Sequence, residues 1–77
     1  MQQHRPLSAI ARDIRANWPN VNFASKPYLA AMQSLNQITD SYYMDSAESV
    51  VRYFLANAQS WRGDKARAIK AELRGLI

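Results

Sequence analysis

The stretch DSAESVVRYFLANAQSWRGDKARAIKAELRGLI, residues Asp45–Ile77, decides the fold because it contains two consecutive amphipathic helix patterns. Its first half repeats apolar residues at the helical period, at Ala47, Val50, Val51, Phe54, Leu55 and Ala58. Asp45, with Glu48 three residues on, is predicted to cap this helix, although a capping box prefers serine or threonine at its first position. We expect this helix to be the central one and to break between Asn57 and Gly63.

The second half of the stretch predicts a helix with a basic side. It begins at Ser60 or Asp64, either of which can cap a helix. Its apolar stripe consists of Ala66, Ile69, Leu73, Leu76 and Ile77. At 100° per residue, Arg67, Lys70 and Arg74 fall within about 60° of one another on an adjoining side.

Two shorter helices are predicted before this stretch. The first carries one apolar face and ends before Pro19, because a residue that precedes proline is disfavoured in a helix; the face consists of Leu7, Ile10, Ala11, Ile14 and Trp18. The second starts at Ser25 or Lys26 and has Pro27 in its first turn; its stripe consists of Tyr28, Leu29, Met32 and Leu35. Residues 19–26 between them are interpreted as a loop in which Val21 and Phe23 fill the core. Asn36–Met44 is compatible with either a loop or a short helical turn.

These patterns predict an all-α fold, a compact bundle of three main helices plus a short helix. We expect a single domain over residues 1–77, with residues 1–6 as a frayed tail. A chain of this length buries only about 60% of its unfolded surface, so every apolar face is needed. We therefore expect both Trp18 and Trp61 to be core or hinge residues and Tyr53 to be half exposed. The remaining core is predicted to comprise Ile10, Ile14, Leu29, Met32, Val51, Phe54, Leu55, Ile69 and Leu73.

Charge is distributed unevenly along the chain. Ten Lys and Arg against six Asp and Glu give a net charge of +4. Residues 1–26 carry 4 − 1 = +3, residues 27–50 carry −3, and residues 51–77 carry 6 − 2 = +4. Such asymmetry bears on partners and association rates rather than on the fold.

The chain has no cysteine, which excludes disulfides and thiolate metal sites. No apolar run approaches the roughly 20 residues of a membrane span, and the first residues do not resemble a signal peptide. These observations predict a protein of the cytoplasm that makes no membrane contact.

Two groups of residues are candidates for partner binding. Arg67, Lys70 and Arg74, extended by Arg62 and Lys65, could bind phosphates or an acidic protein surface; the alternative is a solvated helix face. The tyrosines Tyr42 and Tyr43 lie between carboxylates and could contact a protein; the alternative is that one of them packs inside.

The residues for catalysis are lacking in the sequence. No Ser-His-Asp trio, glycine-rich phosphate loop or paired carboxylates on one face can be assembled, and the only histidine is His4. We therefore predict no enzyme activity, no catalytic residue, no cofactor, no metal site and no small-molecule substrate.

The segments NWPNVNFASKPYLAAM (Asn17–Met32) and YYMDSAESVVRYFLANAQSWRGDKARAIKAEL (Tyr42–Leu73) resemble small proteins carried by bacteriophages, prophages and conjugative elements. The likeness covers most of the chain, and YFLANAQSWRGD is its most distinctive part. It implies an accessory protein of a mobile element, in the cytoplasm of a bacterial host cell. Many such proteins, the anti-CRISPR proteins among them, dock onto a host defence complex.

The function predicted from the sequence is therefore that of a stoichiometric inhibitor or adaptor. Its partner would be a host protein or nucleoprotein complex, such as a CRISPR effector. One alternative is a small DNA-binding regulator that uses the same basic helix. A third possibility is a structural helical module that needs self-association. The predicted contact residues are Arg62, Lys65, Arg67, Lys70, Arg74, Tyr42 and Tyr43.

Overall fold

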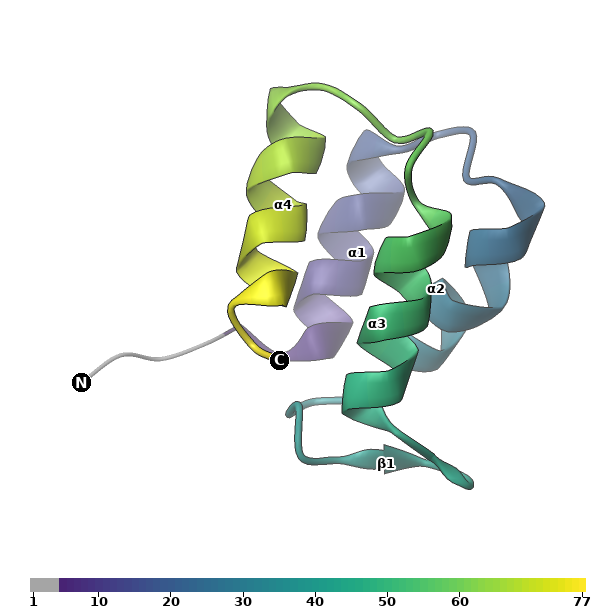
Figure 1. The fold of residues 1–77 in the computed structure, drawn as a ribbon, viewed down its shortest axis with the longest axis vertical. Coiled ribbons are helices and arrows are strands. Elements are labelled where there is room, and N and C mark those ends of the chain that lie inside the picture. Colours follow the sequence, from purple (N-terminus) through teal and green to yellow (C-terminus); the bar gives the residue numbers. More distant parts are fainter. Residues whose placement is uncertain (1–4) are drawn as a thin grey trace.

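A computed structural model describes residues 5–77 (Figure 1). Three eleven-residue helices and one shorter helix are present, as the sequence predicts. The elements are α1 (Leu7–Asn17), the 3₁₀ turn η1 (Phe23–Ser25), α2 (Lys26–Met32), β1 (Ser41–Tyr42), β2 (Asp45–Ser46), α3 (Ala47–Asn57) and α4 (Asp64–Arg74). Helix α1 packs against both α2 and α4, and α2 packs against α3. The prediction of a mostly helical, compact fold is confirmed, but a two-stranded sheet at one end makes the all-α class inexact.

A single hydrophobic core joins all four helices. Eight of the nine core residues predicted from periodicity are at most 2% exposed, and Leu55 is half-buried against the same core. Trp18 and Trp61 are also buried, at 7% and 4% exposure. Their rings stack at a centroid distance of 5.4 Å with 7° between planes, and Trp18 meets Phe54 edge-on at 6.3 Å. The tryptophans therefore fasten the α3–α4 connection to the end of α1.

Helix α1 begins without a side-chain cap. The backbone N–H groups of Leu7 and Ser8 instead donate to the carbonyl oxygens of Asn36 and Leu35, at 2.9 and 2.8 Å. The chain that leaves α2 thus satisfies donors that a helix N-terminus would otherwise leave unpaired. The helix ends at Asn17, before Pro19, as predicted.

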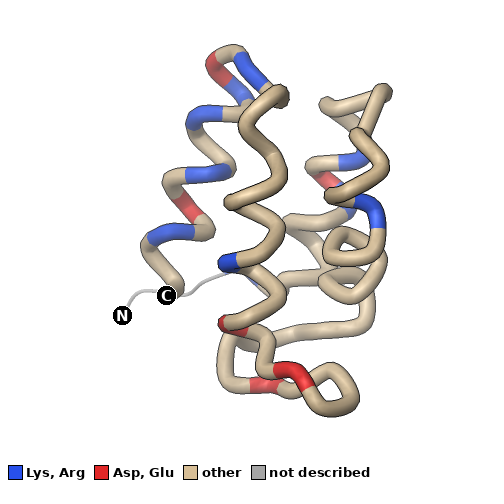
Figure 2. The backbone as a smooth tube through the Cα atoms, turned by 45° about the vertical axis from the view of Figure 1, so that its right-hand side comes forward, with Lys and Arg blue, Asp and Glu red and all other residues tan. Residues whose placement is uncertain are grey.

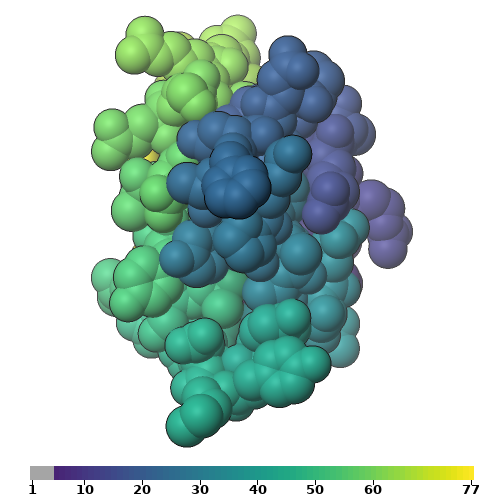
Figure 3. Space-filling view, turned by 90° about the vertical axis from the view of Figure 1, so that its right-hand side faces the viewer, coloured from purple at the N-terminus to yellow at the C-terminus, as the bar shows by residue number. Residues whose placement is uncertain are grey.

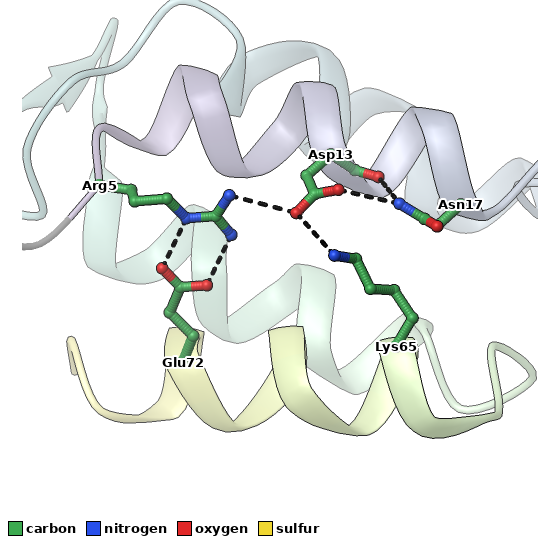
Figure 4. A network of polar contacts seen from close by, with 5 residues as sticks. All are labelled: Arg5, Asp13, Asn17, Lys65 and Glu72. Carbon is green, nitrogen blue, oxygen red and sulfur yellow. Dashed lines mark hydrogen bonds and ion pairs between the residues drawn. The ribbon is translucent and has the colours of Figure 1, made fainter.

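The predicted frayed tail is wrong for Arg5, while residues 1–4 lie outside the described residues. The Arg5 guanidinium donates twice to Glu72, from Nε to Oε2 at 2.9 Å and from Nη2 to Oε1 at 2.7 Å (Figure 4). Its Nη1 reaches Asp13 Oδ2 at 3.1 Å, and Lys65 Nζ lies 3.4 Å from the same oxygen. These contacts tie the start of α1 to α4.

The loop before α2 corrects the prediction for Phe23. Helix α2 starts at Lys26 with Pro27 in its first turn, as predicted, and Val21 packs against the core. Phe23, however, is 88% exposed. Asn22 Nδ2 and the buried Ser25 Oγ both donate to the Asn57 carbonyl that ends α3, at 2.9 and 2.8 Å. Because the side chains of Asn22 and Ser25 both turn inward, Phe23, one of the two residues between them, is directed outward.

The caps of α3 and α4 also differ from the prediction. Ser46, not Asp45, caps α3: its Oγ accepts from the Ser49 N–H at 3.1 Å. Glu48 does not reach back to the cap but pairs with Arg52 at 2.8 Å. Helix α4 begins at Asp64 after Gly63, so neither Ser60 nor Asp64 is its cap.

Asn36–Met44 was expected to be a loop or a short helical turn, but it contains a strand. A turn leads into β1, which pairs with β2 in antiparallel register, Ser41 with Ser46 and Tyr42 with Asp45. Asp40 organises the turn, because its Oδ2 accepts from the backbone N–H groups of Gln37 and Asn36 at 2.9 and 3.0 Å. These two hydrogen bonds hold the pKa of Asp40 below its usual value.

Phe54→Ala tests the core against a matched exposed phenylalanine. Phe54 is fully buried beside Trp18, and loss of such a ring costs about 3–5 kcal/mol of unfolding free energy, which is comparable to the whole stability of so small a domain. We expect its thermal transition, followed by circular dichroism, to disappear or to fall sharply. Phe23→Ala, at 88% exposure, is expected to leave the transition nearly unchanged. Equal losses in the two variants would contradict this core.

Asp40→Asn tests the turn by its pH dependence. A carboxyl whose pKa is lower in the folded than in the unfolded chain stabilises the fold above its unfolded pKa of about 4, and this contribution is lost as the pH falls through the folded pKa. We therefore expect Asp40→Asn to lower the melting temperature at pH 7, and the deficit to shrink below about pH 4. Asp45→Asn, an exposed carboxylate on β2, is the control. A deficit that stays constant from neutral to acid pH would contradict the role of Asp40.

Candidate functional site

Four of the five predicted basic residues line one open groove. Arg62, Arg67, Lys70 and Arg74 surround a volume of about 300 Å³, together with Gln59, Trp61 and Gly63. We call this site the basic groove. It runs from the α3–α4 connection along α4, where Figure 2 shows basic positions recurring down the helix.

Helix period and a sharp turn bring these side chains together. The buried stripe Ala66, Ile69 and Leu73 fixes α4 against the core, so the basic residues of the neighbouring side face outward. Arg62 comes from the connection. It is placed there because Trp61 before it is buried on Trp18, and Gly63 after it takes a φ of +112°, a conformation that favours glycine.

Lys70 connects the two parts of the basic groove. Its Nζ donates to the Trp61 carbonyl oxygen at 2.6 Å and lies 6.0 Å from the centre of the Trp61 ring. Partial burial, followed by the charges of Arg74 and Arg62, lowers the pKa of Lys70. Lys70 therefore links the α3–α4 connection to α4, and its ammonium group lies close to the positive charges of Arg62 and Arg74.

Acidic side chains do not line the basic groove in the described part of the chain. Glu72 of α4 is occupied by Arg5 on the side facing α1. Asp64 lies 3.7 Å from Arg67, but its side chain is fully exposed, and an exposed pair of this kind neutralises little in water. The basic groove thus keeps most of its positive charge.

Lys65 does not share the basic groove. The sequence predicts that it extends the group of Arg67, Lys70 and Arg74, but its Nζ pairs with Asp13 of α1 (Figure 4). The same network anchors Arg5, so Lys65 belongs to the contact between α1 and α4. Whether any of these residues binds a partner stays a prediction.

The tyrosine pair lies apart from the basic groove. Tyr42 is half-buried against the core and Tyr43 is 87% exposed, and their rings meet edge-on at 4.7 Å. Both belong to the hairpin at the end of the bundle where α3 begins, whereas Arg62 follows the end of α3 (Figure 1). The two predicted groups of contact residues therefore form two separate surfaces.

Two further exposed apolar residues, Phe23 and Met44, were not recognised as surface features from the sequence, whereas the half exposure of Tyr53 was predicted. Phe23 and Met44 are 88% and 100% exposed, and Tyr53, expected to be half exposed, is at 55% and stacks on Tyr28 at 5.5 Å. The spacing of Asn22 and Ser25 is the one sequence signal for the outward Phe23, because an asparagine that caps a turn accepts from the N–H three residues on.

The groove offers the chemistry of anion binding. Guanidinium groups donate paired hydrogen bonds to phosphate or carboxylate oxygens, and an ammonium adds a point charge. Over residues 5–77, no three side chains of the His, Cys, Asp or Glu type gather as metal ligands would; His4 lies outside that range. None of the helices in this range has the length and hydrophobicity to cross a bilayer.

Comparison of the chain with family models, curated proteins and solved structures gave no match. The resemblance to small mobile-element proteins accordingly stays a prediction, as do the absence of enzyme activity and the absence of a cofactor.

Because positive charges are crowded in the basic groove, the pKa of Lys70 should depend on the charge of its arginine neighbours. Because the charge of Arg74 lowers the pKa of Lys70, Arg74→Gln is expected to raise that pKa toward its ordinary value. NMR titration of the Lys70 side-chain ε carbon and protons measures it directly. Arg12→Gln, on the exposed side of α1, is the control and should leave it unchanged. An unchanged Lys70 pKa in both Arg74→Gln and Arg62→Gln would contradict the coupling.

Proposed function

We propose that this protein is a non-enzymatic binding protein that docks through the basic groove onto anionic groups of a host protein or nucleoprotein complex. The observation that carries the proposal is the convergence of Arg62, Arg67, Lys70 and Arg74 on one groove without a lining carboxylate. Like charges held close together repel one another, so an anion that enters the groove relieves this repulsion as well as forming its own contacts.

The arrangement is suited to an extended anionic chain. The basic residues follow the length of α4 rather than a single point, which matches successive phosphates or carboxylates better than one small ion. If all four side chains contact phosphates of a duplex, the logarithm of the affinity falls with the logarithm of the salt concentration at a slope of about −3.6.

We propose further that the complex is a host defence assembly such as a CRISPR effector, and that the protein acts as a stoichiometric inhibitor or adaptor encoded by a mobile element. The sequence resemblance and the small size of the chain support this part of the proposal. The basic groove supports it by offering contacts to the nucleic acid or to the acidic protein surface of such an assembly.

A small DNA-binding regulator is the alternative function. Two observations favour the nucleoprotein proposal over it. The connection between α3 and α4 spans residues 58–63, which is longer than the three- or four-residue turn of a helix-turn-helix. Asp64 is also fully exposed in the first turn of α4, where a recognition helix would enter the major groove between two rows of phosphates and a carboxylate would be repelled.

Charge reversal at three groove positions tests the proposed function. The variant Arg62→Glu, Arg67→Glu, Arg74→Glu spares Lys70, because that residue holds the connection. The control, Arg12→Glu, Arg15→Glu, Lys26→Glu, changes the net charge by the same amount away from the groove. Binding is measured against a panel of CRISPR effector complexes, with and without their guide RNA, and against duplex DNA. We expect the groove variant to lose about tenfold or more in affinity, and the control much less.

Three outcomes separate the alternatives. Equal losses in the two variants would show that net charge alone governs binding, and would end the groove assignment. Duplex DNA bound as tightly as any effector complex would favour the regulator. Wild-type protein that binds no member of the panel, even at low salt, would contradict both functions.

A further inference from the structure

Figure 3 shows the side of the molecule formed by η1, α2, α3 and the hairpin. These elements carry large apolar side chains that are exposed. Phe23, Tyr43 and Met44 are nearly fully exposed, and Tyr53 is half exposed and stacked on Tyr28. We call this set of five residues the apolar face. Single exposed apolar residues are ordinary, but several on one side of so small a protein indicate a contact surface.

The hairpin tip adds an independent observation. The register of β1 and β2 leaves Tyr43 and Met44 as a two-residue turn, and Tyr43 has a φ of +54°. Both favoured two-residue turns need a positive φ at the first position, where glycine or asparagine is usual. A tyrosine there is under backbone strain of a kind that tends to collect at functional sites. The turn thus holds a large ring outward at a cost that glycine would avoid.

Charge distinguishes the apolar face from the basic groove. The elements that form the face carry Lys26 and Arg52 against Asp45 and Glu48, so their charges sum to 2 − 2 = 0. Arg52 and Glu48 pair with each other within α3, which leaves Lys26 and Asp45. These two lie toward opposite ends: Lys26 follows η1, and Asp45 follows the hairpin tip at the other end (Figure 1). The net charge of +4 therefore lies elsewhere on the chain.

We propose that the apolar face is the contact surface between two copies of this chain related by a two-fold axis. A two-fold contact uses the same surface on both copies, so that surface must be complementary to itself. A two-fold axis through this face brings the Phe23 and Lys26 end of one copy onto the Met44 and Asp45 end of the other, which joins apolar groups and pairs opposite charges. The basic grooves do not take part in the contact, and the proposal does not rest on their function.

Molar mass in solution tests the contact. Sedimentation equilibrium or light scattering is carried out over a concentration series up to about 0.5 mM, which covers dissociation constants from nanomolar to high micromolar. The wild type is expected to move from 8.8 kDa toward twice that mass. The double variant Phe23→Ser, Met44→Ser should stay at 8.8 kDa, because its dissociation constant for the dimer should rise at least tenfold. Arg67→Ser with Arg74→Ser, in the basic groove, is the control and should associate as the wild type does.

Two further variants test the two-fold arrangement and the turn. Lys26→Glu and Asp45→Lys should each weaken association severalfold, and the double variant should restore it. Tyr43→Gly relieves the backbone and should fold as well as the wild type while associating more weakly. A wild type that is monomeric throughout the series overturns the proposal. A dimer that persists after the loss of Phe23 and Met44 also overturns it, as does a wild type that forms assemblies larger than a dimer.

Discussion

The stack of Trp18 on Trp61 is the contact on which both the bundle and the basic groove depend. Trp18 closes α1 and also meets Phe54 of α3, and Trp61 lies in the connection to α4, so three helices converge on one aromatic cluster. Arg62 and Gly63 follow Trp61 directly, and Lys70 donates to the Trp61 carbonyl. Burial of one indole ring therefore determines where the connection lies, where α4 starts and which cations come together.

The distribution of acidic side chains makes the groove basic. Glu72 and Lys65 lie on the side of α4 that faces α1, where Arg5 and Asp13 pair with them. Without Arg5, Glu72 would be an unpaired carboxylate on the same short helix as three groove cations. A network of exposed pairs of this kind adds little to stability, but it separates the opposite charges of α4 onto different sides.

Periodicity predicted the elements, and non-local contacts decided what it missed. The apolar stripes of α1, α3 and α4 follow the helical period, so their core residues could be read directly from the sequence. Phe23 could not, because its direction depends on hydrogen bonds from Asn22 and Ser25 to Asn57, some 35 residues away. The strands are two residues long and too short to show an alternating pattern. The angular spacing of Arg67, Lys70 and Arg74 predicted that they group together. Lys65 lies outside this group because it pairs with Asp13 of another helix, which its position in the sequence does not reveal.

The most direct test of this account is an NMR titration of the wild-type protein with inorganic tripolyphosphate at low salt, followed at the backbone amides and the arginine Nε–H groups. The account predicts that saturable shifts concentrate on Arg62, Arg67 and Arg74 and on the Trp61 and Lys70 amides. Lys65, Arg12 and Arg15 should shift little. Shifts spread evenly over all basic residues, or centred on α1, would contradict the claim that burial of Trp61 builds an anion-binding groove.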